Sequence, residues 1–143
     1  MKIYASRYGK GRLNPNIQKR DQILFGEYDP AKYTGGIRRF ENVDAKTIEE
    51  LVDNGFVDVT MYQKASTTIE EFLDFNEDWD DHYTFIGFAI SDRRDDYGIV
   101  IDGIRRDEFI HASPETEEER DDFYEFSKNA DDVFLDAGYA WWD

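Results

Sequence analysis

Carboxylates are the side chains whose number and spacing in this chain could do chemistry. The 143 residues include 33 Asp or Glu against 17 Lys or Arg, for a formal net charge of −16. Acids three or four positions apart on a helix lie about 5–6 Å from one another. Phosphates along one DNA strand repeat on a comparable scale, with a rise of about 3.4 Å per nucleotide. Rows of such acids could therefore occupy a basic groove built for nucleic acid.

We expect this contact to be made by three groups of acids, around Trp79, in the turn after residue 91, and in the last third of the chain. The alternative is a solvated face that only confers solubility. Like charges destabilise the folded state by repulsion, and no acid between 117 and 125 has a Lys or Arg four residues downstream. This favours the binding interpretation, with the partner-binding acids Asp78, Asp80, Asp81, Asp95, Asp96, Glu117, Glu118, Glu119, Asp121, Asp122, Glu125 and Asp132.

The basic residues gather at the other end of the sequence. Residues 1–40 hold nine Lys or Arg and three acids, whereas residues 41–143 hold eight Lys or Arg and 30 acids. We expect one domain over 1–143 whose residues 1–20 form a basic, mobile arm. The arm could grip phosphates and stack bases, fold back on the acidic body, or contact nucleic acid while the body binds a protein. Its basic residues are Arg7, Lys10, Arg12, Lys19 and Arg20.

Catalytic and metal chemistry have little support in the sequence. Asp74, Asn76 and Asp78 match the opening of a calcium loop, but Trp79 replaces its glycine and Phe85 its bidentate glutamate. The chain has no cysteine, so a thiolate nucleophile or Cys-ligated zinc is excluded. No phosphate-binding loop, dinucleotide fingerprint or nucleophile elbow occurs, and the two histidines form no ligand pair. We predict a protein that is not an enzyme and has no cofactor or metal, although counting acids does not exclude a carboxylate pair.

The first 40 residues give weak signals for the elements that position these groups. Alternation over 2–8 predicts a short strand, and 9–20 read as a basic loop. Residues 23–25 predict a second short strand, and the Asp-Pro and Gly-Gly pairs in 26–40 predict turns.

The middle of the chain gives clearer signals. Asp44 is a cap for a helix over 45–54 that stops at Gly55, and Thr67 with Glu70 form a capping box for a second helix. Residues 84–91 and 98–104 predict two strands of a hairpin, with a bulge or a close backbone approach at Gly87. The side chains expected to face inward from the second helix are Ile69, Phe72, Leu73 and Phe75.

The last third predicts one long helix. Ser113 and Pro114 are a helix start, apolar residues follow at steps of three and four as far as Ala137, and Gly138 ends the helix. The apolar tail with Trp141 and Trp142 should cover the core; the alternative is an exposed binding hot spot. The expected fold is α+β, a small antiparallel sheet covered by two short helices and one long C-terminal helix.

Three stretches between residues 44 and 104 resemble proteins of phages and mobile elements of Gram-positive bacteria: TIEELVDNGFVD, ASTTIEEFLDF and FIGFAISDRRDDYGIVIDGI. The acidic body with a basic head is also similar to the anti-CRISPR and anti-restriction class of host-defence inhibitors. Members of that class share a strategy rather than a fold, so the resemblance implies an activity and transfers no site residue.

These observations predict a non-enzymatic inhibitor that binds a nucleic-acid-handling host-defence protein, either a CRISPR effector or a restriction enzyme, by nucleic-acid mimicry. The alternative is an immunity protein or antitoxin that neutralises one basic toxin. The expected partner is a basic protein surface, with no duplex DNA bound by the acidic body and no membrane. No apolar run approaches the roughly 18 residues of a membrane span, which favours the cytoplasm of a bacterial host.

Overall fold

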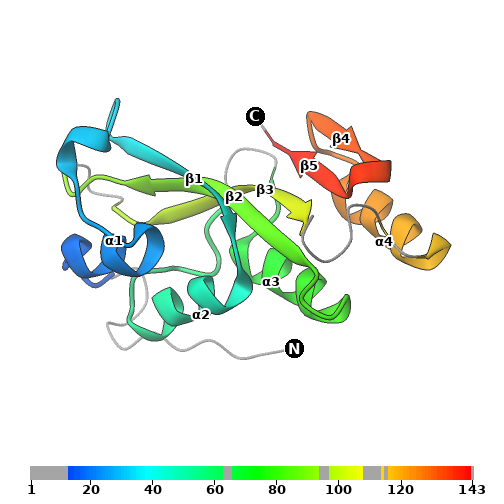
Figure 1. Cartoon of the computed structure of the whole chain (residues 1–143), viewed down its shortest axis with the longest axis horizontal. Helices are drawn as coiled ribbons and strands as arrows, with labels where there is room; N and C mark the ends of the chain where they lie inside the picture. The colour runs from blue at the N-terminus through cyan, green and yellow to red at the C-terminus, as the bar shows by residue number, and fades with distance from the viewer. Residues whose placement is uncertain (1–12, 63–65, 94–96, 108–113, 115, 143) are drawn as a thin grey trace.

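The chain folds as an α+β protein in which helices pack against one side of an antiparallel sheet (Figure 1). The structure is a computed structural model and describes residues 13–62, 66–93, 97–107, 114 and 116–142. In these residues the five strands have the order β1-β2-β3-β5-β4. The strands are β1 Ile37–Val43, β2 Tyr83–Ile90, β3 Ile99–Arg106, β4 Asp132–Phe134 and β5 Tyr139–Trp141; the helices are α1 Ile17–Phe25, α2 Ala45–Asp53, α3 Ile69–Asp78 and α4 Glu117–Ser127, with 3-10 turns η1 Pro30–Lys32 and η2 Leu135–Ala137.

The β2–β3 hairpin confirms the prediction from the sequence. The register shifts where Ile86 pairs with Gly103 and Gly87 with Ile101, so β3 carries one extra residue, Asp102. A Cβ added to Gly87 would lie 1.9 Å from the Val100 carbonyl oxygen. Only glycine allows this close approach, which explains why a residue poorly suited to a strand lies inside one.

Helices α2 and α3 confirm the predicted caps closely. The Asp44 carboxylate accepts a hydrogen bond from the Thr47 amide at 2.9 Å, and Gly55 follows the helix with a positive φ of 80°. The capping box of α3 lies one residue later than predicted, between Thr68 and Glu71. The expected inward residues of α3 are all buried: Ile69, Phe72, Leu73 and Phe75.

The core lies between the sheet and these helices. Phe72 packs edge-on against Phe85 of β2, with ring centroids 6.2 Å apart, and against Trp142, at 5.4 Å. Trp142 is 2% exposed. The prediction that the apolar tail covers the core is therefore confirmed for Trp142, whereas Trp141 lies on β5 and is partly exposed.

The N-terminal predictions are wrong for the described residues. Residues 17–20 of the predicted loop and the predicted strand of 23–25 belong to one helix, α1, whose first turn is capped by the Asn16 side chain on the Lys19 amide at 3.2 Å. Residues 13–16 have no regular structure, and 9–12 lie outside the described residues. The inward face of α1 includes Arg20 and Asp21, which form a buried ion pair. Charged residues at buried positions hide the helical periodicity from the sequence. The predicted turns of 26–40 also extend too far, because β1 begins at Ile37, and the predicted strand of 2–8 lies outside the described residues.

The single long C-terminal helix is also wrong. Helix α4 begins after Thr116 rather than at the predicted Ser113–Pro114, of which Ser113 lies outside the described residues, and it ends at Ser127. Strand β4, turn η2 and strand β5 follow, and Gly138 ends η2 instead of a helix. Strand β5 pairs with β3, with Trp141 opposite Gly103. This non-local pairing overrides a local spacing that is typical of a helix.

Within the described residues, no helix has both the length and the apolar character needed to cross a membrane.

Candidate functional site

Helix α4 presents the acidic surface, and one inward glutamate fixes how the helix is turned. The Thr116 hydroxyl caps the helix by accepting from the Glu119 amide at 3.1 Å. The Glu119 side chain, 2% exposed, accepts a hydrogen bond from the Tyr83 hydroxyl at 2.7 Å and forms an ion pair with Arg106. Arg106 also contacts His82 Nδ1 at 3.2 Å. Glu119 is therefore part of the fold and is not available to a partner, contrary to its predicted role.

The remaining acids of α4 face away from the core. Phe123 and Ser127 continue the inward face begun by Glu119 and are fully buried. The exposed acids consequently form rows along the outside of the helix, in which residues three or four positions apart lie about 5–6 Å from one another. They are Glu117, Glu118, Asp121, Asp122 and Glu125.

Few of these outward acids are neutralised. In the described part of the chain, Glu125 pairs with Lys128 at 3.1 Å, and the helix's own Arg120 pairs with Asp136 of η2 at 2.7 Å. The other four outward acids form no ion pair with a described residue. Tyr124, 51% exposed, lies among them and offers an aromatic ring on the same helix.

A second group of acids lies at the C-terminal end of α3. Asp80 and Asp81 both adopt positive φ values, 57° and 58°, a conformation that Asp tolerates better than most residues. The buried Asn76 side chain holds this turn, since its oxygen accepts from the Tyr83 amide at 2.8 Å and its nitrogen donates to Asp81 at 3.3 Å. Asp78 is exposed in the last turn of the helix.

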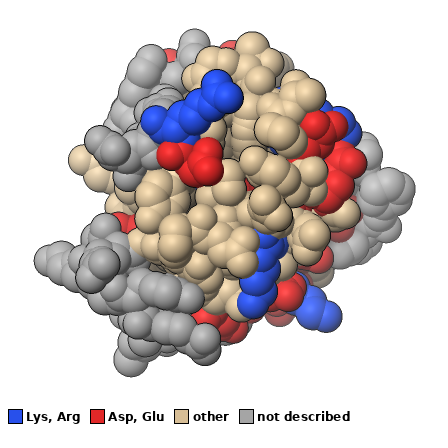
Figure 2. Space-filling model, turned by 90° about the vertical axis from the view of Figure 1, so that its left-hand side faces the viewer, with Lys and Arg blue, Asp and Glu red and all other residues tan. Residues whose placement is uncertain are grey.

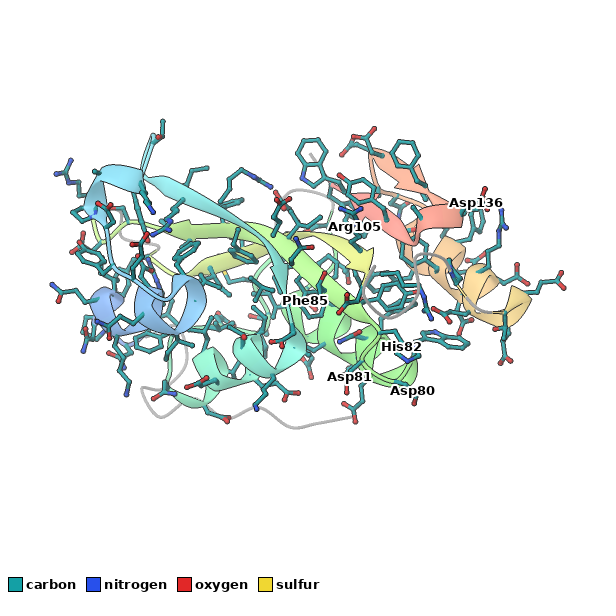
Figure 3. The ribbon with its side chains drawn as sticks, in the orientation of Figure 1. Asp80, Asp81, His82, Phe85, Arg105 and Asp136 are labelled. Carbon is teal, nitrogen blue, oxygen red and sulfur yellow. The ribbon has the colours of Figure 1, made fainter. Side chains whose placement is uncertain are left out.

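The two acidic groups lie at the same end of the molecule. Phe75 of α3 stacks on Phe126 of α4 with ring centroids 4.4 Å apart, so the helices are neighbours. In Figure 3, Asp80 and Asp81 lie below the sheet, on the half of the molecule that carries α4. The structure therefore places residues 78–81 and the outward acids of α4 on the same half of the molecule. We call these residues the acidic end: Asp78, Asp80, Asp81, Glu117, Glu118, Asp121, Asp122 and Glu125.

The other predicted partner-binding residues that the structure describes do not join the acidic end. Asp132 lies on β4, on the other side of the sheet from α4. Arg20 is 1% exposed and is used internally, since it donates to the Ile90 carbonyl and the Tyr33 hydroxyl at 2.8 Å each. Lys19 is exposed on α1, at the opposite end of the molecule (Figure 1). Asp95, Asp96, Arg7, Lys10 and Arg12 lie outside the described residues.

The end of the molecule that carries α1 has a different surface. Figure 2 faces this end and shows a described surface that is largely uncharged, with acidic and basic residues interspersed. Glu27 pairs here with both Lys32 and Arg38, and the hydrogen bond from Lys32 lowers the pKa of its carboxyl. A polar hollow of 430 Å³ also opens at this end beside Tyr33. The hydroxyl of Tyr33 is engaged by Arg20 and Asp21, so it is not free to act on a ligand.

A surface that the sequence analysis missed lies on the side of the sheet away from the helices. Phe88, Ile90 and Val100 pack with Ile37 and Met61 over one part of this side. No described helix covers the part over β3, β5 and β4 (Figure 1). We call this part the open face; its side chains are Arg39, Glu41, Ile86, Arg105, Asp132, Phe134, Tyr139 and Trp141.

The open face contains a hollow of 250 Å³. Ile86 and Trp141 pair with Gly103 from its two neighbouring strands, and both side chains line the hollow. Arg39 and Arg105 line the same hollow. The alternation of Tyr139, Ala140 and Trp141 could have indicated this face, but the prediction treated these residues as an apolar tail that covers the core.

Electrostatics on the open face centre on Asp102, the extra residue of the β3 bulge. Arg39 donates to both of its carboxylate oxygens, at 3.1 and 3.2 Å. Burial raises the pKa of the Asp102 carboxyl, and the Arg39 guanidinium opposes that shift. Burial, with the charges of Asp132 and Asp102, also raises the pKa of the Tyr139 hydroxyl. The tyrosine therefore stays neutral at physiological pH and serves as a contact surface.

The described residues include two buried ion pairs and two exposed contact surfaces. They contain no group of three or more His, Asp or Glu placed to hold a metal ion. In each of the buried ion pairs Arg20–Asp21 and Arg106–Glu119, a tyrosine hydroxyl donates a hydrogen bond to the carboxylate. Both pairs therefore stabilise the fold. The arrangement offers two contact surfaces of different character, an acidic end and an aromatic open face.

Comparison with known proteins gives no relative: no protein-family model matches the chain, and neither the curated proteins nor the solved structures contain a match.

Proposed function

We propose that this chain is a non-enzymatic inhibitor that binds a basic, nucleic-acid-handling host-defence protein through its acidic end. The target would be a CRISPR effector or a restriction enzyme in the cytoplasm of a bacterium infected by a phage or carrying a mobile element. The observation that carries the proposal is the set of outward acids on α4, four of which form no ion pair with a described residue.

The geometry of α4 suits mimicry of a phosphate backbone. Its 11 residues include six acids and one base. Glu119 anchors the helix so that the other five acids point outward in rows, at intervals of about 5–6 Å. Arg and Lys side chains that normally hold phosphates can pair with carboxylates, and arginine does so with two parallel hydrogen bonds. The turn at 78–81 extends the charged surface beyond the helix.

The distribution of charge at the acidic end favours a binding role over a role in solubility alone. Four acids that pair with no Lys or Arg of the described part of the chain lie on one short helix, although the chain has arginines that it places elsewhere, two of them in buried ion pairs. A long-range negative field also accelerates association with a basic surface and repels duplex DNA.

The test begins with capture of a partner from host lysate on the full chain, with and without nuclease treatment. The captured protein should be a nucleic-acid-binding protein, and duplex DNA should compete with the inhibitor for it. Affinity should fall as NaCl rises from about 50 to 300 mM, because salt screens charge pairs.

A pair of charge-reversal variants locates the contact. Glu118→Lys with Asp122→Lys should weaken binding roughly tenfold or more, because like charges then meet across the interface. The matched control reverses Glu50 and Asp53 to lysine on α2; both residues are exposed there, and the net charge changes equally. Equal losses in both double variants would mean that total charge matters and α4 does not. An affinity independent of salt would refute the mimicry, and capture of a small toxin would favour the immunity-protein alternative.

A further inference from the structure

The open face of the sheet has a protruding half and a hollow half. Phe134 protrudes from the edge strand β4 and is 59% exposed, with its ring centroid 5.7 Å from that of Tyr139. Asp132 lies two residues away on the same face, because side chains two apart on a strand share a side. This half therefore offers an apolar knob beside a negative charge.

The hollow half lies on the neighbouring strands. Its cavity of 250 Å³ is lined by Ile86, Trp141 and Tyr139 and by the two arginines Arg39 and Arg105. An apolar cavity of about 150 Å³ is known to bind benzene, so this hollow has room for a phenyl ring. It offers a hole for an aromatic ring beside two positive charges.

We propose that the open face binds a second copy of this chain in a twofold-symmetric dimer. A twofold interface places the same patch of both copies in contact, so the patch must complement itself. Here the Phe134 ring of each copy would enter the hollow of the other, and Asp132 would approach Arg105 and Arg39 of the facing copy. Strands lie about 4.8 Å apart, and β5 separates β4 from β3, so knob and hollow fit within one contact patch.

Charge favours a second copy over nucleic acid on this face. Aromatic rings beside arginines also suit single-stranded nucleic acid, but a chain of net charge −16 repels a polyanion. On the open face the positive charges of Arg39 and Arg105 offset the negative charges of Glu41 and Asp132. Two copies would therefore meet where the net charge of the surface is close to zero. The remaining repulsion between the bodies acts over a longer range and is screened by salt.

Sedimentation velocity on the full chain tests the proposal, over concentrations from about 1 µM to 1 mM. We expect a concentration-dependent dimer that becomes tighter as NaCl rises to physiological strength, the opposite of the salt dependence expected for the acidic end. Phe134→Ala should weaken the dimer at least tenfold, because large aromatic anchors dominate such interfaces. Tyr124→Ala is the matched control, an exposed aromatic on α4, and should leave the dimer unchanged.

Charge-swapped partners show whether the contact joins two molecules. Asp132→Arg and Arg105→Asp should each prevent dimerisation, whereas a mixture of the two variants should form a heterodimer, since both symmetry-related contacts then pair opposite charges. A chain that stays monomeric up to about 1 mM, a dimer insensitive to Phe134→Ala, or a mixture that stays monomeric would overturn the proposal. So would a labelled single-stranded oligonucleotide that binds the wild type and not Phe134→Ala. Loss of target capture in the α4 variants leaves these outcomes unaffected.

Discussion

Neutralising Glu119 should destabilise this protein more than neutralising any of the exposed acids of α4. In the native structure Glu119 and Arg106 are both almost completely buried, and their ion pair is supported by the Tyr83 hydroxyl. Glu119→Gln keeps the size and the hydrogen-bonding oxygen but leaves the Arg106 guanidinium without its counter-charge. Removing one partner of a buried pair typically costs about 3–5 kcal/mol, a large part of the roughly 5–15 kcal/mol that stabilises a domain.

The control for this substitution lies one residue away. Glu118→Gln removes the same charge from the same helical turn, but Glu118 is exposed and has no ionic partner among the described residues. It should cost no more than about 0.3–1 kcal/mol, from the lost interaction with the helix dipole. In a chain of this length we expect Glu119→Gln to lower Tm by roughly 10–20 °C, against a few degrees for Glu118→Gln.

Urea denaturation followed by circular dichroism measures both variants, and a double-mutant cycle with Arg106→Met isolates the pair. If the ion pair is buried as described, the double variant should be more stable than the sum of the single losses predicts, because neither charge is left alone. Equal free energies of unfolding for Glu118→Gln and Glu119→Gln would refute the burial of Glu119. The face of α4 that packs against the core would then be a different one, and the acids described as outward would not all point outward.

The charges of the fold lead to four further predictions. Burial and repulsion from Glu77 and Glu71 raise the pKa of the Asp74 carboxyl. The folded state therefore favours the protonated form, and this stabilisation is lost as pH rises above the pKa of the unfolded chain, about 3.9. Asp74→Asn should consequently raise Tm at pH 7 and not at pH 3. Hydrogen bonds from Thr67 and its neighbour lower the pKa of Glu71, so Glu71→Gln should have the opposite effect, a lower Tm at pH 7 that disappears in acid. Burial raises the pKa of the Tyr83 hydroxyl, so wild-type stability should decline above about pH 10, and Tyr83→Phe should make that decline shallower in alkaline urea titrations. Moderate NaCl should raise Tm by screening repulsion among the acids, whereas a flat or falling Tm would mean that the acids are already paired.

The elements that the sequence predicts correctly are those with a local signal at both ends. Helix α2 has a capping carboxylate at Asp44 and a glycine with positive φ at Gly55. The hairpin of β2 and β3 has two apolar runs around a polar turn, and Gly87 marks its bulge. Each of these signals acts over a few residues, so no knowledge of the tertiary structure is needed to interpret it.

The two largest errors arise where distant contacts decide the outcome. Arg20 occupies a buried position of α1 because three groups pair with its guanidinium. They are Asp21 of the same helix, the Tyr33 hydroxyl after η1 and the Ile90 carbonyl of β2. In the last third of the chain the apolar spacing continues beyond Ser127 as if the helix did. There β5 pairs with β3 and β4 pairs with β5, so Ala140 and Val133 pack against the core as strand residues. No local pattern contains this result.

The site was predicted in part for the same reason. Composition identifies α4 as acidic, but only its packing shows that Glu119 turns inward. A signal was present, since Glu119, Phe123 and Phe126 recur at helical spacing, and an acid on an apolar face suggests an internal ion pair. The error in the C-terminal third also grouped Asp132 with the helix, whereas it belongs to the open face.

The placement of the two surfaces has a consequence for how they could work together. Helix α4 packs beneath β4 and β5, and the open face is the other side of the same strands (Figure 1). A dimer formed through the open face would therefore leave both acidic ends accessible, at opposite sides of the assembly. A partner with two basic sites, or one long basic channel, would then bind two ends at once, and the second contact would benefit from a high effective concentration. Phe134→Ala should in that case weaken binding to such a partner, although Phe134 does not contact that partner. Binding to a target with one site should stay unchanged. If both kinds of target lost affinity equally, the open face would contact the target directly and the bivalent arrangement would be wrong.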